Sequence, residues 1–237
     1  MSATLGPPKL ITNNLVLYLD AANLSSYPGS GTTWTDVSNN NRTGTLTGGP
    51  TFSSANGGSI VFDGSNDLVD ITNTASTFAF ANSTFTVNIW FKQSALSNGA
   101  LISKNGAAAG WSIWALSDGT IVSYMKNGSS VDNYDRYTSA VITANTWINI
   151  VSIFTTSTTV AGNNSVTHYV NGVLNTGTVV VGSGAYGDET STNLQLGRRT
   201  TTPWFTGNIA IAQIYNTGLT ANDVLTNYNS VKRRFGL

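Results

Sequence analysis

Short segments in which apolar and polar residues alternate recur along the whole chain, and clusters of Gly, Asn, Asp or Ser separate them. In residues 85–91 the odd positions are Phe, Val, Ile and Phe, whereas the even positions are Thr, Asn and Trp. A period of two places these sets on opposite faces of a strand, so the pattern predicts a half-buried antiparallel strand. We count about a dozen such segments, and a series of short strands with regular turns is typical of a sandwich.

Two local patterns refine this expectation. Asn171-Gly172 lies between Tyr169-Val170 and Val173-Leu174, and both linker residues tolerate positive φ, which favours a type I′ hairpin. Residues 147–154 carry apolar groups at both alternating positions, as expected for a strand near the middle of a covered sheet. Two stacked layers therefore fit the sequence better than one.

The strands are spread evenly over 237 residues, without a linker-like gap. A chain of this length can bury roughly 70–75% of its unfolded surface without a metal or disulfide. We therefore predict an all-β fold, a two-sheet antiparallel jelly-roll sandwich with a short C-terminal helix. Residues 1–14 are expected to form an N-terminal arm, and residues 15–237 a single domain.

The helix is predicted near the C-terminus. Thr220 can act as the N-cap, Asp223 stands three positions later, and the segment Ala221–Tyr228 has a modest apolar face. The basic residues Lys232–Arg234 follow and would complement the negative end of the helix dipole.

The composition excludes several classes of function. Only 9% of residues are charged, and eleven basic residues balance eleven acidic ones, which excludes a nucleic-acid-binding surface built on bulk positive charge. No apolar stretch approaches the ~20 residues of a membrane span, so we expect no membrane insertion. The absence of cysteine excludes disulfides, thiolate metal sites and thiol catalysis.

Residues for acid–base catalysis are also scarce. The only glutamate, Glu189, follows Asp188 in a Gly/Ser/Thr-rich segment, while Asp132 and Asp135 lie in a stretch without alternation that we predict to be a solvated loop. Glycoside hydrolysis needs two facing carboxylates, and no Glu-x-Asp-x-x-Glu strand is present. We therefore predict no enzymatic activity and no catalytic residue.

The only histidine, His168, could act as a base toward Ser165 or Thr167, since a Ser–His pair is the minimal nucleophilic unit. No Gly-x-Ser-x-Gly elbow or orienting acid accompanies it. A structural role for this imidazole is the stronger interpretation.

Aromatic side chains offer flat faces on which sugar rings can stack. Trp34 and Trp204 lie in Gly/Thr/Pro-rich segments, so we predict them to be exposed ligand-binding residues, and Arg198-Arg199 could bind acidic sugars. The alternative is that these rings fill the core. Trp111 and Trp114 are three positions apart and must point to opposite faces of a strand.

The ordered set of strand segments from about Leu15 onward resembles the concanavalin A-like or laminin G-like jelly-roll superfamily. No single segment is specific, but their order and spacing are. The segments are SIVFDGSNDLV (59–69), FTVNIWF (85–91), LISK (101–104), WINI (147–150), HYVNG (168–172), LQLGR (194–198) and FTGNIAIAQIYN (205–216).

Related modules often carry calcium, and Asp63-Gly-Ser-Asn-Asp67 groups hard oxygen ligands in one turn. Asx side chains also commonly cap their own turns. The acidic pair that many relatives have in a late strand falls here on Ala210 and Ile211. We therefore assign no metal ligand and expect no cofactor, with calcium as the alternative.

Three further segments resemble the jelly-roll modules in structural proteins of large tailed bacteriophages: LVLYLDAAN (15–23), YPGSGTTW (27–34) and NYNSVKRRF (227–235). The resemblance implies a non-enzymatic virion structural protein at the virion surface, such as a capsid decoration, head-fibre or tail-fibre component. Its partners would be other virion proteins, including capsid or fibre subunits, and also a cell-surface glycan. Residues 10–14 or the C-terminal helix would dock it to another virion protein. A carbohydrate-binding adhesin or lectin is the alternative, and a glycan hydrolase is a third.

Overall fold

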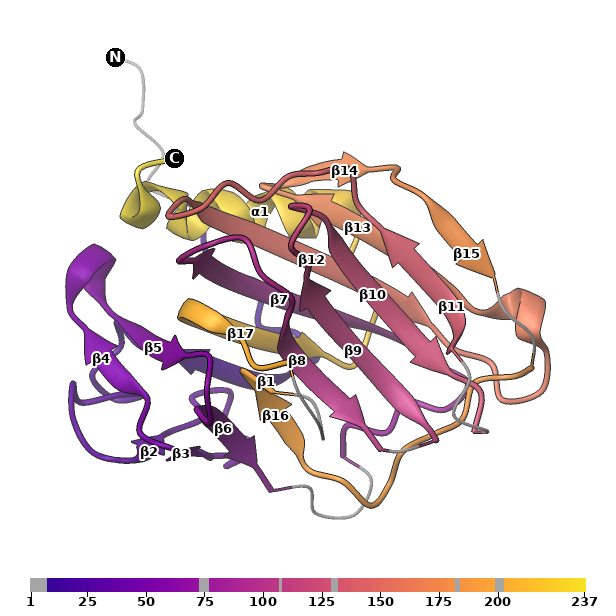
Figure 1. The fold of residues 1–237 in the computed structure, drawn as a ribbon, viewed down its shortest axis with the longest axis horizontal. Helices are drawn as coiled ribbons and strands as arrows, with labels where there is room; N and C mark the ends of the chain where they lie inside the picture. The colour runs from indigo at the N-terminus through magenta and orange to yellow at the C-terminus, as the bar shows by residue number, and fades with distance from the viewer. Residues whose placement is uncertain (1–7, 73–76, 107, 129–131, 182–183, 199–202) are drawn as a thin grey trace.

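Two antiparallel sheets face each other across an apolar core in the computed structural model, which describes residues 8–72, 77–106, 108–128, 132–181, 184–198 and 203–237 (Figure 1). The prediction of an all-β sandwich with a short C-terminal helix is confirmed. Core residues from both sheets, such as Phe85 and Trp111, belong to one buried cluster, so the two sheets share a single core.

Sheet 1 contains eight strands in the order β14-β13-β12-β7-β17-β5-β4, with β1 also paired to β17. Its strands are β1 (Leu15–Asp20), β4 (Thr51–Ser53), β5 (Ser59–Asp63), β7 (Thr84–Gln93), β12 (Trp147–Thr155), β13 (Ser165–Val170), β14 (Val173–Asn175) and β17 (Thr206–Tyr215). The long apolar strand β12 lies between β7 and β13, as its two-faced apolar pattern predicts.

Sheet 2 contains nine strands in the order β15-β11-β10-β9-β8-β16-β6-β3-β2. Its strands are β2 (Thr33–Trp34), β3 (Gly44–Thr47), β6 (Leu68–Ile71), β8 (Gly99–Asn105), β9 (Gly110–Ala115), β10 (Ile121–Lys126), β11 (Asp132–Tyr137), β15 (Val179–Val181) and β16 (Leu194–Leu196). Short 3₁₀ turns occupy Ala55–Gly57 (η1), Ala161–Asn163 (η2) and Lys232–Phe235 (η3).

Strand β7 is buried on both faces, which corrects the prediction of a half-buried strand. Its inward face packs in the core, where the Phe85 ring stacks on Phe154 with centroids 4.7 Å apart. Its outward face carries Trp90, which stacks on Tyr228 and Phe235 of the C-terminal segment. The alternation alone could not show that a later segment covers this face.

Polar side chains on the same outer face form a chain of amides. Asn149 Nδ2 donates to Asn88 Oδ1 at 2.6 Å, and Asn88 Nδ2 donates to Gln213 Oε1 at 2.8 Å. These residues sit side by side on β12, β7 and β17. Because buried polar groups are stable only with partners, the amides help to fix the register of the three strands.

Helix α1 (Ala221–Val231) begins as predicted and ends three residues later than predicted. Thr220 and Asp223 form a capping box, in which the Asp223 amide donates to Thr220 Oγ1 and the Thr220 amide donates to Asp223 Oδ2. The helix extends beyond Tyr228 because its last turn and η3 pack on Trp90 and Trp147.

The predicted hairpin at Asn171-Gly172 is confirmed, with φ of 49° and 79° at the two residues. A Cβ atom on Gly172 would lie 2.9 Å from the Tyr228 ring. Glycine therefore serves both the positive φ and the close approach of α1 to this turn.

Two expectations about strands are wrong. The segment containing Asp132 and Asp135 forms β11, which pairs with β10 and β15. Seventeen strands occur in the described part of the chain, more than the dozen expected. Several of them have only two to four residues, too few for alternation to be recognised, and long-range pairing defines them instead.

Candidate functional site

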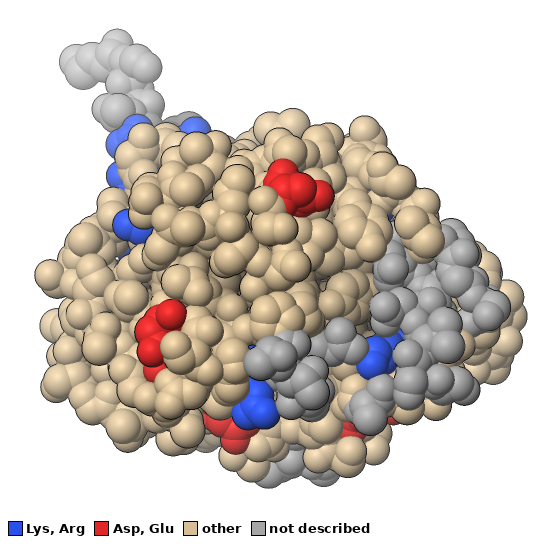
Figure 2. All heavy atoms as spheres, in the orientation of Figure 1, with Lys and Arg blue, Asp and Glu red and all other residues tan. Residues whose placement is uncertain are grey.

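A surface pocket of about 280 Å³ lies beside β16, and it is lined by Ser191, Thr192, Asn193, Gln195 and Arg198. The lining contains hydroxyl, amide and guanidinium groups and no acidic residue. Charged side chains are sparse and separated on the molecular face drawn in Figure 2. The pocket therefore concentrates hydrogen-bonding groups, with Arg198 as the charged residue of its lining.

Arg198, one of the lining residues, also packs against the Trp204 ring, which is not part of the lining itself. The Arg198 guanidinium carbon is 4.7 Å from the centre of the Trp204 ring, a cation–π distance. The Arg198 carbonyl accepts a hydrogen bond from Ser103 Oγ at 2.7 Å, and the Phe205 amide donates to Gly197 O at 2.9 Å. Phe205 is fully buried, so it anchors the neighbouring Trp204, which is partly buried.

The two pocket amides are oriented by one carboxylate. Asp70 on β6 accepts hydrogen bonds from Asn193 Nδ2 at 2.6 Å and from Gln195 Nε2 at 3.0 Å. Gln195 is directly opposite Asp70 in the ladder. Because each amide uses its NH₂ group toward Asp70, its carbonyl oxygen is directed away from that carboxylate. Both amides are therefore set in one orientation.

A buried lysine and the single glutamate hold the loop that forms the pocket rim. Lys104 Nζ donates to the backbone oxygens of Glu189 and Thr192, each at 2.7 Å. Glu189 Oε1 accepts from the Ser191 amide, the Ser191 hydroxyl and the Thr192 amide at 2.6, 2.6 and 3.0 Å. The rim is thus shaped by charged groups that point into the protein.

These contacts shift the ionisation of the groups involved. Burial alone would raise the pKa of Glu189, but hydrogen bonds from Ser191 and Thr192 together bring it below its ordinary value. Burial lowers the pKa of Lys104 and raises the pKa of Asp188. The lowered pKa of Glu189 agrees with its role as a hydrogen-bond acceptor in the loop.

The prediction that Trp34 is exposed is wrong. Trp34 lies in β2, its side chain is 0% exposed, and it belongs to the central core cluster. The strand directs Thr33 outward and Trp34 inward, so the Trp34 ring cannot serve as a surface platform. The alternative of core filling holds for this residue, whereas Trp204 remains available.

Other sequence candidates have mixed outcomes. Trp111 lies in the core and Trp114 in a separate cluster on the opposite face of β9, as their spacing predicts. Arg199 lies outside the described residues. Asn193 and Gln195 were not predicted from the sequence, although the Leu-Gln-Leu alternation of β16 could have indicated that Gln195 faces outward.

His168 is fully buried, and it does not form a nucleophile–base pair with Ser165 or Thr167. Its Nε2 lies 2.8 Å from Ser123 Oγ of the opposite sheet, and Ser123 Oγ lies 2.9 Å from Ser152 Oγ. The network bridges β10, β12 and β13 inside the sandwich. Burial, with a smaller contribution from the charge of Arg136, lowers the pKa of His168 to about 3, so this imidazole is a neutral structural residue.

The carboxylates of the candidate calcium turn bind backbone groups. Asp67 Oδ2 accepts from the Asp63 amide at 2.9 Å, and Asp63 Oδ1 accepts from the Ser65 amide at 2.8 Å. Within the described ranges, no cluster of three or more His, Asp or Glu residues could hold a metal ion. The geometry is that of a self-capped turn.

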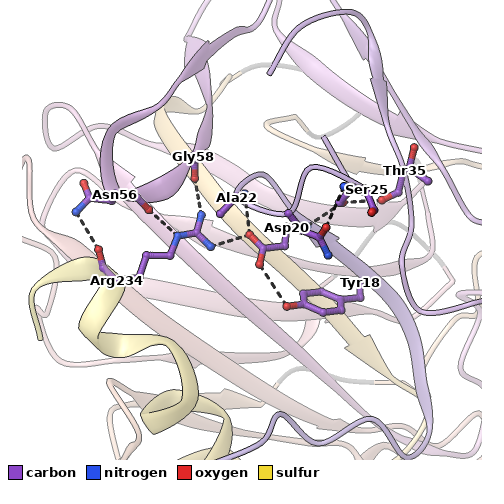
Figure 3. A network of polar contacts seen from close by, with 10 residues as sticks. Tyr18, Asp20, Ala22, Ser25, Thr35, Asn56, Gly58 and Arg234 are labelled. Carbon is purple, nitrogen blue, oxygen red and sulfur yellow. Dashed lines mark hydrogen bonds and ion pairs between the residues drawn. The ribbon is translucent and has the colours of Figure 1, made fainter. Parts of the chain in front are cut away.

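The C-terminal segment is joined to the N-terminal part of the body (Figure 3). Arg234 forms an ion pair with Asp20 at 2.6 Å and donates to the backbone oxygens of Asn56 and Gly58 at 2.6 and 2.5 Å. The Ile11 amide donates to Asn227 Oδ1 at 2.9 Å. Both segments proposed for docking to another protein thus make contacts within the molecule.

None of the described helices is both long enough and apolar enough to cross a bilayer.

A family model described as the Concanavalin A-like lectin/glucanases superfamily matches residues 63–225. The match covers the strands that build the pocket, including β6, β8 and β16. No curated protein matches the sequence.

Several solved structures with a similar fold are binding domains of clostridial toxins. The binding domain of Paraclostridial Mosquitocidal Protein 1 has a TM-score of 0.68 and 18% identity, over 92% of this chain and 52% of that chain. The binding domain of Botulinum neurotoxin DC in complex with rat synaptotagmin II has a TM-score of 0.67 and 17% identity, over 93% and 52%. A structure concerning botulinum neurotoxin type C, whose cell entry depends on two ganglioside molecules, has a TM-score of 0.66 and 16% identity, over 93% and 52%. The chain spans about half the length of these proteins, and at this identity the likeness establishes the fold alone.

Proposed function

Because the chain belongs to the Laminin_G_3 family of the concanavalin A-like lectin/glucanases superfamily, we propose that it is a non-catalytic binding module that contacts a carbohydrate at the pocket beside Trp204. The observation that carries the proposal is the pairing of an aromatic ring and a guanidinium with a pocket of hydroxyls and amides. Sugars are recognised by stacking on aromatic faces and by oriented hydrogen bonds.

The chemistry of the pocket supports binding rather than hydrolysis. A glycosidase needs an acid and a second carboxylate on either side of the scissile bond. The carboxylates nearest the lining residues, Asp70 and Glu189, already accept hydrogen bonds from pocket side chains or loop amides. Their arrangement positions other groups and does not present two carboxylates to a ligand.

The similar toxin domains add support at the level of function class. Their names describe a complex with rat synaptotagmin II in one case and interaction with two ganglioside molecules in another. From these domains we carry over to this chain only the general class of function, which is non-enzymatic binding to a protein or a glycan.

A glycan array with purified protein tests the proposal. We expect Trp204→Ala and Arg198→Ala each to weaken binding of the recognised glycan at least ~5-fold, since stacking and charge-assisted contacts are each worth about 1 kcal/mol or more. The matched control is Lys92→Ala, which removes a second cation–π pair, on Trp147. Unchanged melting temperatures would show that the folds are intact. Glycan binding that survives both pocket variants would refute the pocket assignment.

We also propose that the protein lies at the virion surface, as a capsid decoration, head-fibre or tail-fibre component in contact with other virion proteins. The support is the resemblance of three segments to modules of tailed-phage structural proteins. Asp20 of segment 15–23 and Arg234 of segment 227–235 form an ion pair. Two of the three segments are therefore in contact in the folded protein.

Mass spectrometry of gradient-purified particles tests this location. We expect the chain at high copy number per particle, because a decoration or fibre component repeats with the symmetry of the lattice. Particles that lack the chain would refute the virion assignment without bearing on glycan binding.

A further inference from the structure

One side of the sandwich exposes an apolar run without charge. β14 and β15 are the outermost strands of sheets 1 and 2, and residues 176–178 join them (Figure 1). Val173, Leu174, Val179 and Val180 are 68%, 52%, 38% and 50% exposed, and residues 173–181 contain no charged residue or proline. Edge strands are usually protected by charge, proline or a covering segment, so this edge has the properties of a contact surface.

The backbone of β15 has an outward set of hydrogen-bonding groups. The Tyr137 amide donates to Thr178 O at 2.8 Å, and the ladder continues with Arg136 opposite Val179 and Asp135 opposite Val180. In an antiparallel ladder the N–H and C=O of one residue point to the same side, and successive residues alternate. Thr178 and Val180 therefore face β11, whereas the backbone groups of Val179 and Val181 face away from it.

We propose that β15 pairs antiparallel with β15 of a second copy of this chain, so that sheet 2 continues across a twofold axis at Val180. This register sets Val179 opposite Val181 of the second copy. Both residues direct N–H and C=O outward, so the two symmetric pairs form four hydrogen bonds. The three residues are all valine, so the strand is complementary to itself, as a twofold interface requires.

Electrostatics also favour a second copy over a charged partner. Residues 173–181 carry no charge that could attract a basic or acidic segment of another protein. The whole chain has zero net charge, so two copies do not repel each other. The strand has only three residues, and its contact is smaller than a standard interface of ~1,600 Å². The dimer is therefore weak in solution and is strengthened where copies are held close together.

Cysteine cross-linking tests the register directly, because the chain has no cysteine of its own. On the twofold axis Val180 faces Val180 in a non-hydrogen-bonded pair, where the Cα atoms are about 4.5 Å apart, within the range for a disulfide. We expect Val180→Cys to form a disulfide-linked dimer under mild oxidation, at least ~10-fold faster than Leu96→Cys. Leu96 is a matched control that is 42% exposed in the loop between β7 and β8.

A second variant separates edge pairing from collision of exposed thiols. Val179→Pro in the Val180→Cys background removes one outward N–H and leaves the bonds to β11 in place, so we expect it to reduce the dimerisation rate to that of Leu96→Cys. Equal rates for Val180→Cys and Leu96→Cys would overturn the proposal. A dimerisation rate unaffected by Val179→Pro, with an unchanged melting temperature, would overturn it as well and would point to a different contact surface.

Discussion

At the residue scale, Trp34 and Trp204 show how local geometry decides the role of a side chain. Both follow Gly/Thr/Pro-rich residues, yet Trp34 is fully buried and Trp204 is only partly buried. Trp34 is the inward residue of a two-residue strand. Trp204 lies just before β17 and precedes Phe205, which occupies the core, whereas the Trp204 ring packs on the Arg198 side chain. The neighbour that fills the core, rather than the composition of the segment, distinguishes the two.

His168 carries a prediction about acid stability. Its pKa is about 3 in the folded protein and 6.5 ordinarily, so below pH 6.5 the unfolded chain binds a proton that the folded protein does not. The stabilising contribution is complete above pH 6.5 and is lost as the pH falls toward 3, by at most about 1.4 kcal/mol per pH unit.

When the pH is lowered from 6.5 to 5, we expect the unfolding free energy of the wild type to fall by roughly 2 kcal/mol more than that of His168→Gln, because the variant lacks the titrating group. Urea unfolding at pH 7, 6 and 5 measures this difference. Parallel pH profiles for the two proteins would contradict the assignment of His168 as the buried neutral group.

At the element scale, the C-terminal helix is part of the sandwich rather than an appendage. Phe235 stacks on Trp90 with centroids 4.2 Å apart and lies 4.7 Å from the Trp147 ring centre. We expect Phe235→Ala to reduce the unfolding free energy by roughly 3 kcal/mol, the usual cost of truncating a buried aromatic side chain. Chemical denaturation measures it. Leu225→Ala, on the exposed side of α1, is the control and should change stability by less than ~0.5 kcal/mol; equal effects would contradict the packing.

The turn at residues 63–67 carries a prediction about calcium. Because its carboxylates accept backbone hydrogen bonds, we expect neither Ca²⁺ nor EDTA to change the melting temperature. A ligand that binds only the folded state must raise stability in proportion to the logarithm of its concentration. Differential scanning fluorimetry over a calcium series checks this, and a rise that EDTA reverses would revive the calcium alternative.

Local patterns predicted some elements and missed others for a physical reason. The capping box at Thr220 and the hairpin at Asn171-Gly172 depend on neighbouring residues, so the sequence revealed them. β11 and β15 exist because they pair with strands distant in the sequence. The pocket likewise brings Asp70 of β6 to Gln195 of β16, and no local pattern indicates that contact. Trp204 and Arg198 were predicted from the sequence, whereas the two pocket amides and the carboxylate that orients them were not.

At the scale of the whole molecule, one core cluster includes residues from both sheets, such as Leu17 of β1 in sheet 1 and Trp111 of β9 in sheet 2. The Asp20–Arg234 ion pair and the stacking of Phe235 on Trp90 add the C-terminal segment to the same body. Elements that share one core unfold together, since exposing part of it removes the packing of the rest. The single-domain prediction for residues 15–237 therefore has a thermodynamic consequence.

We expect one unfolding transition, with a calorimetric enthalpy equal to the van't Hoff enthalpy and coincident near-UV and far-UV circular dichroism curves. Phe235→Ala should shift this transition to lower temperature without splitting it, because α1 and the sheets melt as one unit. Differential scanning calorimetry of the wild type and the variant measures both properties. A separate low-temperature transition in the variant, reporting loss of α1 while the sandwich stays folded, would contradict a single cooperative domain and would assign the helix to an independent unit.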